Sequence, residues 1–188
     1  PMCGSGTFLI EAALMAHDIA PGLARKFGFF RLDNFDAALW QKLLTEAEAR
    51  KRPLVAQPIF GSDISQDQVE RARQNLAAAD MHECVRLERA DLLLRSPPAA
   101  EGVLVANPPY GIRLEEQEGL AAFYPKLGDA LKRRFAGWRC YFISADPQLP
   151  RLIGLKASRR TPLFNGALEC RLLEYRIIAG PMRRTKPA

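Results

Sequence analysis

The stretch Val103-Leu104-Val105-Ala106-Asn107-Pro108-Pro109-Tyr110-Gly111 decides the fold, because it joins a short apolar strand to a stiff turn. Residues 103–106 have the pattern of a buried strand. The Asn-Pro-Pro sequence after them excludes a helix and restricts two successive φ angles. In an open α/β sheet, ligands bind beyond the carboxyl ends of the strands. The segment therefore predicts a binding site that presents an amide side chain, a proline carbonyl and an aromatic ring.

The turn suits the binding of a planar NH2 group. The lone pair of an exocyclic amine on a nucleobase, or of a side-chain amide, is delocalised, so the nitrogen is a poor nucleophile. The side-chain oxygen of Asn107 and the carbonyl oxygen of Pro108 can accept its two hydrogens, while Tyr110 can stack on the ring that carries it. Such acceptors stabilise the transition state more than the ground state, because they act where charge develops. The same residues are also compatible with an ordinary strand-terminating turn.

The chain opens with a glycine turn that leads into an apolar helix, expected at residues 7–17. Gly4 and Gly6 allow the backbone to approach a ligand closely, and the N–H groups at the start of the helix are unpaired. The turn lacks the third glycine of GxGxxG and the Gly-Lys-Ser/Thr ending of a phosphate-binding loop. It suits a nucleoside with an amino-acid tail, although an ordinary strand-to-helix turn has the same pattern. The candidate cofactor-binding residues here are Cys3, Gly4, Ser5, Gly6 and Thr7.

A carboxylate follows the next predicted strand, at residues 58–62. Asp63, with Ile64 after it, is expected to bind the cofactor, because a carboxylate at a strand end can hold both hydroxyls of a ribose. The alternative is a residue that caps the following helix. The interval between Gly6 and Asp63 is much longer than a minimal βαβ unit allows, so residues 18–52 are expected to form an insertion.

A second carboxylate follows the predicted strand at residues 84–90. Asp91, with Leu92 after it, is expected near the adenine ring, where the carboxylate can accept a hydrogen bond from the amino group. A loop or helix-cap role is again the alternative. The glycine turn, the two acids and the Asn-Pro-Pro-Tyr turn follow one another on successive predicted strand ends, and this order favours one ligand site over four unrelated turns.

These segments together resemble the bacterial 23S rRNA guanine-N2 methyltransferases of the RlmL type, which are Rossmann-like and depend on S-adenosylmethionine. The resemblance rests on residues 1–12, Asn107–Leu114 and Phe164–Cys170, and it extends to about Ile178. It implies an α/β fold, a mostly parallel sheet flanked by helices with an antiparallel C-terminal hairpin. It also implies methyl transfer from S-adenosylmethionine to the N2 amine of a guanine in 23S rRNA, without a metal.

The resemblance assigns roles to the residues of the Asn-Pro-Pro-Tyr turn. Asn107 and Pro108 are expected to orient the amine and Tyr110 to stack the base, while Asn107 also contacts the cofactor. A base that is paired in the rRNA has to be flipped out before it can react.

The same resemblance implies segments outside this sequence. The family places a hydrophobic strand ending in Asp before the glycine turn and a THUMP-type RNA-binding domain upstream, and some members carry a second methyltransferase module. We therefore expect the first central strand of the sheet to be missing here. The methyltransferase domain is expected at residues 1–180, with a tail or linker at 181–188.

Composition agrees with one globular domain and a polyanionic partner. The 188 residues have 48% hydrophobic content, and no apolar run reaches the length of a membrane span. The net charge of +6 suits binding to rRNA. No signal peptide is visible, which favours a cytoplasmic enzyme with reduced thiols. The cysteines lack the spacing of metal ligands: Cys3, Cys84, Cys140 and Cys170.

The insertion and the C-terminal part contain basic and aromatic clusters. Arg50–Arg52 close a helix expected at 36–51, where cations complement the helix dipole. Arg159 and Arg160 are expected just before a hairpin, in a position that suits phosphate groups. The insertion carries an aromatic group that is expected to be buried or, alternatively, to stack on RNA bases: Phe27, Phe29, Phe30 and Trp40.

The remaining pattern predicts helices at about 66–79 and 118–135, and strands at 102–106 and 139–144. Ser65 to Gln68 form a capping box. Asn165-Gly166 predicts a tight hairpin turn, so the sheet is expected to end antiparallel.

Three other functions fit part of this pattern. An adenine-N6 DNA methyltransferase and a protein glutamine methyltransferase both use Asn-Pro-Pro-Tyr, and a catalytically idle RNA-binding module would share the basic surface. A DNA enzyme needs a recognition region, for which residues 111–180 leave little room.

Overall fold

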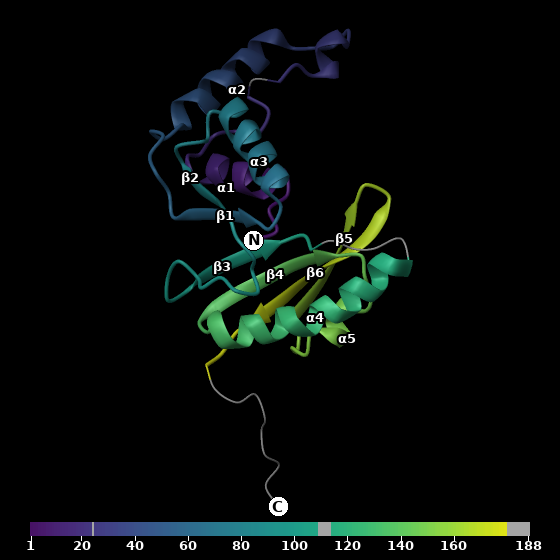
Figure 1. The fold of residues 1–188 in the computed structure, drawn as a ribbon. Helices are drawn as coiled ribbons and strands as arrows, with labels where there is room; N and C mark the ends of the chain where they lie inside the picture. The colour runs from purple at the N-terminus through teal and green to yellow at the C-terminus, as the bar shows by residue number, and fades with distance from the viewer. Residues whose placement is uncertain (24, 109–113, 180–188) are drawn as a thin grey trace, which may run out of the picture.

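Two sheets lie side by side in the computed structural model, which describes residues 1–23, 25–108 and 114–179, with the backbone alone for 114–118 (Figure 1). The smaller sheet pairs β1 (Ile59–Asp63) in parallel with β2 (Val85–Arg89). In the larger sheet the order is β3-β4-β6-β5. Its strands are β3 (Gly102–Ala106), β4 (Trp138–Ser144), β5 (Arg159–Asn165) and β6 (Leu168–Arg176).

The larger sheet has the mixed edge that the sequence predicts. β3 and β4 are parallel, whereas β6 is antiparallel to both β4 and β5. β5 and β6 form the expected hairpin, and Gly166 in its turn has a φ of +62°, a left-handed conformation that glycine adopts readily. The expected place of Arg159 and Arg160 was wrong, because both belong to β5 and do not precede the hairpin.

Helices cover the two sheets from opposite sides (Figure 1). α1 (Thr7–Ala16) and α3 (Gln66–Ala78) pack on the smaller sheet, where Leu9 and Ala13 meet Leu76 in one apolar cluster. α4 (Leu114–Arg134) and α5 (Leu149–Leu152) pack on the larger sheet. The larger cluster is centred on α4 and the strand side chains beneath it, among them Tyr124, Leu127, Leu131, Cys140, Phe142, Leu173 and Tyr175.

Local signals explain most helix ends. Ser65 caps α3 by accepting a hydrogen bond from the N–H of Gln68, as the capping box predicts. Gly6, with a φ of +86°, directly precedes α1. α4 begins at Leu114, four residues before the expected start at 118, and the short α5 was not predicted. Proline at the second position of α5 is compatible with a helix start, but four residues give no periodic signal.

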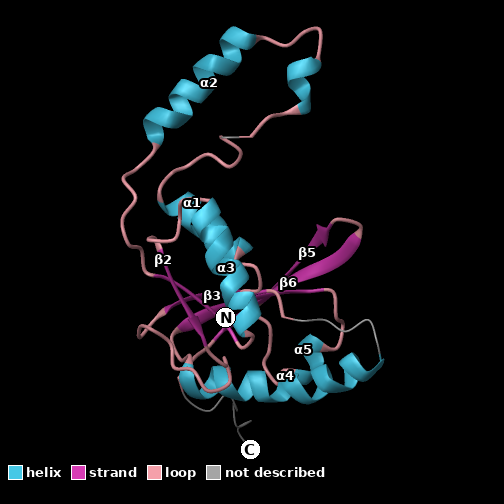
Figure 2. Cartoon of the chain, turned by 45° about the horizontal axis from the view of Figure 1, so that its top comes forward, coloured by secondary structure: helices cyan, strands magenta, loops and turns pink. Residues whose placement is uncertain are grey.

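The expected insertion forms an arm that projects from the rest of the molecule (Figure 2). It contains a short 3-10 helix, Gly28–Arg31, and α2 (Ala37–Arg50), and neither helix has a buried residue. The expected burial of its aromatic side chains was therefore wrong. Phe27, Phe29, Phe30, Phe35 and Trp40 pack against one another, and Phe29 stays 39% exposed. Such a cluster stabilises the arm itself without anchoring it to the main core.

The base of the arm is held by polar contacts. The backbone N–H of Arg52 donates to the carbonyl of His17, and His17 Nδ1 lies 2.9 Å from the carbonyl oxygen of Pro53. Arg50 forms an ion pair with Asp18 at 2.8 Å. Arg50 therefore links the end of α2 to the segment that follows α1. Within the described residues, no helix is both long enough and apolar enough to cross a membrane.

Candidate functional site

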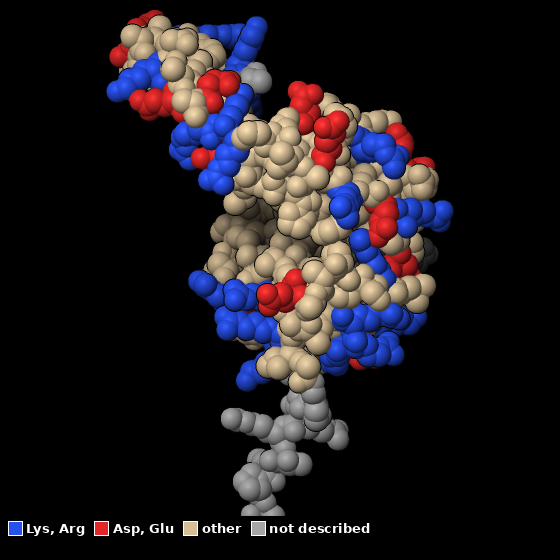
Figure 3. Space-filling view, turned by 90° about the vertical axis from the view of Figure 1, so that its left-hand side faces the viewer, with Lys and Arg blue, Asp and Glu red and all other residues tan. Residues whose placement is uncertain are grey.

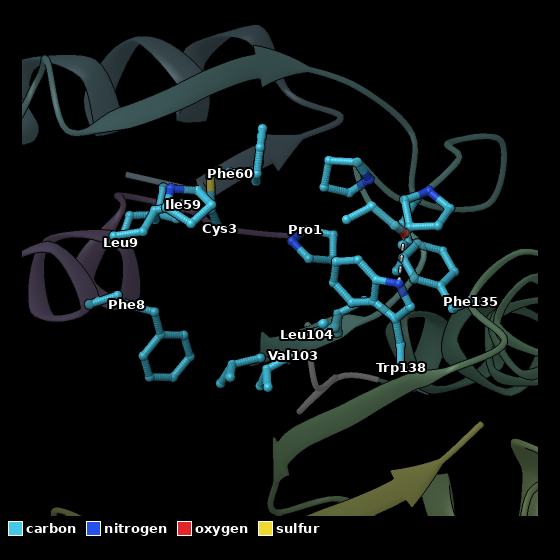
Figure 4. Close-up of a pocket in the computed structure, with 18 of the residues that line it drawn as sticks. Pro1, Cys3, Phe8, Leu9, Ile59, Phe60, Val103, Leu104, Phe135 and Trp138 are labelled. Atoms are coloured by element: carbon cyan, nitrogen blue, oxygen red, sulfur yellow. Dashed lines mark hydrogen bonds between the residues drawn. The ribbon is translucent and has the colours of Figure 1, made fainter. Parts of the chain in front are cut away.

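An apolar cavity of about 600 Å³ separates β1 from β3 (Figure 4). Ile59 and Phe60 of β1 lie on one side of it and Val103 and Leu104 of β3 on the other, while Phe8 of α1 and Trp138 of β4 extend its walls. Figure 3 shows the molecule hollowed on this face, with Lys and Arg side chains on either side of the opening. In the part of the chain that the structure describes, no strand lies between the two edges that face the cavity, so β1 and β3 belong to separate sheets.

The first residues of the chain reach across the end of this cavity. The N–H of Cys3 donates to the carbonyl of Ser62, on the edge of β1 that faces β3. Met2 packs against the core of the larger sheet and Cys3 against the core of the smaller one. The glycine turn is thus held at the carboxyl end of β1.

The glycine turn and Asp63 form one hydrogen-bonded unit. The N–H of Gly4 donates to Asp63 Oδ2 at 3.0 Å, and the N–H of Ser65 donates to Asp63 Oδ1 at 3.0 Å. Asn75 of α3 donates its side-chain N–H to the carbonyl of Ser5 at 2.9 Å. The end of β1 and the C-terminal half of α3 therefore fix the shape of the turn.

The two glycines of the turn have different surroundings. A Cβ at Gly4 would meet open space, whereas a Cβ at Gly6 would lie 3.1 Å from the Cβ of Ala72 in α3. Gly6 is needed for packing and for its φ of +86°, while the backbone at Gly4 is open to a ligand. Ser5 and Thr7 are exposed beside it.

The other predicted cofactor residues are spread over two strand ends. Ile64 is 62% exposed directly after β1. Asp91 Oδ1 accepts a hydrogen bond from the N–H of Leu93 at 2.9 Å, so this carboxylate shapes the turn after β2. Leu92 is 4% exposed, belongs to the larger core and lines the apolar cavity.

Asn107 and Pro108 follow β3 directly, as predicted. Asn107 is exposed, and Pro108 is among the fully buried side chains. The turn is therefore anchored by its proline, and the amide remains accessible to a ligand. The predicted stacking residue, Tyr110, lies outside the described residues.

The thiol of Cys3 is not prepared for nucleophilic catalysis. Burial, followed by the nearby charge of Asp63, raises its pKa above the ordinary value of 9.0, so the thiol is protonated at neutral pH. All four cysteines are free. In the described parts of the chain, no three His, Cys, Asp or Glu side chains gather as metal ligands would.

The structure adds one polar feature that the predicted site did not include. Asp146 follows the carboxyl end of β4, and its Oδ2 accepts a hydrogen bond of 2.8 Å from the hydroxyl of Tyr124. Burial of Tyr124 and this hydrogen bond raise the pKa of its hydroxyl well above 10. A signal was present in the sequence, since Asp146-Pro147 follows an apolar strand in the same way that Asn107-Pro108 does.

Strand order, glycine turn, strand-end acid and Asn-Pro-Pro turn together define a Rossmann-like methyltransferase domain. A model of the UPF0020 family, the RMKL-like methyltransferase domain, matches residues 1–174. The chain belongs to this family.

Individual relatives agree with this assignment. A ribosomal RNA large subunit methyltransferase K/L of Shewanella sp. (strain W3-18-1) is 44% identical over 191 aligned residues, which cover 100% of this chain. The crystal structure of SMU.472 complexed with SAH has a TM-score of 0.84 and 31% identity over 99% of this chain. The crystal structure of a predicted N6-adenine-specific DNA methylase from Listeria monocytogenes has a TM-score of 0.81 and 32% identity over 94% of this chain.

All three relatives are longer proteins. The chain spans 27% of the Shewanella protein, 48% of SMU.472 and 45% of the Listeria protein.

Proposed function

We propose that this domain transfers a methyl group from S-adenosylmethionine to the N2 amine of a guanine in 23S rRNA. The observation that carries the proposal is the exposed Asn107 beside the buried Pro108 at the carboxyl end of β3. Three comparisons support the proposal. They are the match to the UPF0020 family, the name of the Shewanella relative, a ribosomal RNA large subunit methyltransferase K/L, and the similarity to a structure complexed with SAH.

The residues of the glycine turn fit S-adenosylmethionine. The open backbone at Gly4 can approach the methionine part, and the exposed Ser5 and Thr7 offer hydroxyl groups at the start of α1. Each oxygen of Asp63 accepts one backbone hydrogen bond and keeps a second lone pair for a ribose hydroxyl. Asp91 retains its Oδ2 for the adenine amine. Ile64, exposed after β1, offers an apolar surface to the adenine ring.

The Asn107–Pro108 turn prepares the amine. The side-chain oxygen of Asn107 and the carbonyl oxygen of Pro108 accept the two amine hydrogens, which favours a pyramidal nitrogen with its lone pair directed away from both acceptors. S-adenosylmethionine supplies an electrophilic methyl group. The nitrogen displaces the sulfonium in line, the C–S bond electrons remain on sulfur as a thioether, and the extra proton on nitrogen then leaves to water. The acceptors stabilise the positive charge that develops on nitrogen.

A strand from the longer protein completes the site. We infer that the segment upstream of Pro1 occupies the apolar cavity, because β1 and β3 present facing edges there and Pro1 itself lines the space. The resulting order β2-β1-new strand-β3-β4-β6-β5 is a single open sheet. The proposed rRNA substrate is reached with an upstream RNA-binding domain of the THUMP type.

A second candidate is methylation of adenine N6, and the name of the Listeria relative supports it. Both amines fit the Asn107–Pro108 turn, so the two candidates differ in the base and not in the transfer chemistry. If adenine is the substrate, the site has to accept a base whose amine lies between two acceptor nitrogens, N1 and N7.

The test uses the full-length protein that contains this domain. Mass spectrometry of rRNA nucleosides from cells that lack the gene should show loss of one N2-methylguanosine, and the purified enzyme should restore it. Asn107→Ala should lower kcat at saturating cofactor and RNA by at least about 100-fold, since removing one preorganised hydrogen-bonding group costs this much in other enzymes. Unchanged N2-methylguanosine in the deletion, or near-normal kcat of the variant, would contradict the proposal.

A further inference from the structure

A second hollow, of about 210 Å³, lies at the carboxyl end of β4. It is smaller than pockets that enclose drug-sized ligands, which suits a single base rather than the whole cofactor. One wall is the segment from Ser144 to Pro147 with Pro150, and the other is the beginning of β6. The strand residues of that second wall are Glu169, Arg171 and Leu173.

The sheet register places this hollow next to the proposed amine site. Ala106 of β3 is paired with Phe142 of β4, so continuing the parallel register by two residues sets Pro108 beside Ser144. Ser144 is in turn paired with Arg171 of β6. The backbone at Pro108 is therefore two strand spacings away from Arg171, so one base can lie between the amine site and β6.

Asp146 makes the first wall rigid, and both of its carboxylate oxygens already accept hydrogen bonds from the protein. Its Oδ2 accepts from Tyr124 and its Oδ1 accepts from the N–H of Gln148, each at 2.8 Å. Its own N–H donates to Ser144 Oγ at 3.0 Å. The Asp146 carboxylate is committed to the protein, so the groups that remain for a ligand are those on β6.

Glu169 and Arg171 place an acceptor and a donor on one side of β6. They are two residues apart, so their side chains leave the same face of the strand. Both are exposed, and within the described part of the chain neither forms an ion pair. Their partners across the hairpin are Phe164 and Pro162, which carry no charge.

Phe164 adds an exposed aromatic ring to this group. It is 72% exposed and lies directly across from Glu169 in the hairpin. A large exposed ring beside a carboxylate and a guanidinium is the arrangement that proteins use for unstacked bases, which are held by stacking and by hydrogen bonds to the base edge.

We propose that Glu169 and Arg171 read the edge of the target base, and that they select guanine over adenine. Guanine carries a donor, N1–H, beside its N2 amine, and an acceptor, O6, beyond it. The carboxylate of Glu169 accepts from N1–H and the guanidinium of Arg171 donates to O6, while Phe164 stacks on the ring. Adenine instead has an unprotonated nitrogen beside its amine, which faces the carboxylate with no hydrogen between them.

This inference rests on the proposed function, and it is tested through the base itself. The substrate is an rRNA oligonucleotide with the mapped target guanine, compared with the same RNA carrying 2-aminopurine there. 2-Aminopurine keeps the amine but lacks both N1–H and O6. The full-length wild-type enzyme should prefer guanine by at least about 100-fold in kcat/KM, because sites built to hydrogen-bond a group reject analogues without it.

Glu169→Gln should lower kcat/KM on the guanine RNA by about tenfold or more. It should also reduce the preference for guanine over 2-aminopurine, because a glutamine amide can donate to N1 of 2-aminopurine. Arg171→Lys, which keeps the charge, should lower guanine methylation less than Arg171→Ala. Glu83→Gln, at an exposed carboxylate near β2, is the matched control and should behave as wild type.

The outcomes separate the two proposals. If wild type methylates guanine but its preference over 2-aminopurine is below tenfold, or Glu169→Gln leaves the preference unchanged, the reading role is overturned and the proposed function stands. If wild type methylates no guanine of rRNA, the proposed function fails first. The comparison of the two RNAs with wild type needs no variant, so misfolding of a variant cannot decide it.

Discussion

The N–H of Gly4 donates a 3.0 Å hydrogen bond to Asp63 Oδ2, which joins the glycine turn to the end of β1 across 59 residues of sequence. Asp63 therefore has two tasks in the proposed site. It fixes the backbone that approaches the cofactor, and it offers its remaining lone pairs to a ribose. Both tasks need a carboxylate or amide oxygen at this position.

Asp63→Ala should weaken binding of S-adenosylmethionine by at least about tenfold, because hydrogen bonds to a charged group contribute about 1.5–3 kcal/mol. Asp63→Asn keeps one side-chain oxygen and should weaken the binding of S-adenosylmethionine less. Calorimetric titration of the full-length protein measures the dissociation constants, and kcat at saturating cofactor should stay within a fewfold of wild type. A large fall in kcat with unchanged affinity would assign Asp63 to the chemical step instead.

Much of this site was predictable because strand ends carry local signals. Asn107-Pro108 restricts its own backbone, and Ser65 caps its own helix, so neither needs information from distant residues. The hydrogen bond between Gly4 and Asp63 could not be predicted, since it depends on how α1 packs against β1. The exposed aromatic arm was misjudged for a similar reason. Phe27 and Trp40 have the composition of a core, but the aromatic rings that they contact among the described residues all belong to the arm.

Gly128 and Gly119 of α4 should respond in opposite directions to alanine. A Cβ at Gly128 would overlap the carbonyl oxygen of Ile153, next to α5, whereas a Cβ at Gly119 would meet open space. Gly128→Ala should lower the free energy of unfolding by about 1–3 kcal/mol or more. Gly119→Ala should raise it by up to about 0.5–1 kcal/mol, the helix preference of alanine over glycine. Denaturant titrations of both variants check this, and equal shifts would show that α4 and α5 do not touch here.

Stability should fall at alkaline pH because burial raises the pKa of several core groups: Tyr124, and the register partners Cys140 and Tyr175. Burial raises the pKa of the Cys140 thiol from 9.0 to about 12 and that of the Tyr175 hydroxyl from 10.0 to about 12. The folded protein thus keeps protons that the unfolded chain releases between pH 9 and about 12, and the free energy of unfolding decreases through that window. Tyr175→Phe should flatten the decrease above pH 10.

Tyr141→Phe is the control for this experiment, because Tyr141 lies on the opposite face of β4 and is only half-buried. It should retain the alkaline loss of stability. Urea titrations at pH 8, 10 and 11 give the slopes, and a Tyr175→Phe slope equal to that of wild type would exclude Tyr175 as its source.

The arm should contribute to RNA binding and little to the stability of the core. No residue of its two helices is buried, and its cations include Arg25, Lys26 and Arg31. Replacing residues 20–50 by a short flexible linker should change the melting temperature by only a few degrees. It should also reduce both RNA affinity and the slope of log affinity against log salt, because fewer counterions are released. Unchanged salt dependence would place RNA elsewhere on the protein.

The open edges of β1 and β3 lead to the last prediction. Among the described residues no strand pairs with these edges, so the backbone amides of β1 and β3 that face the cavity should exchange hydrogen rapidly in residues 1–188 alone. In the full-length protein, the strand that we infer upstream of Pro1 should protect them. Hydrogen-exchange mass spectrometry of peptides that cover residues 58–63 and 102–107 measures this difference, with peptides of β6 as the internal reference because both its edges are already paired.

Methyl transfer should also differ between residues 1–188 and the full-length protein. Residues 1–188 should bind RNA weakly and in a salt-sensitive way, through their net charge of +6, but should transfer little or no methyl label to undermethylated rRNA. The full-length protein should transfer it, because the upstream strand that we infer is expected to join the two sheets and to hold the glycine turn at a fixed distance from Asn107. Equal exchange at β1 and β3 in the two proteins, together with equal methylation, would show that the cavity is not the place of a strand and that the domain is already complete.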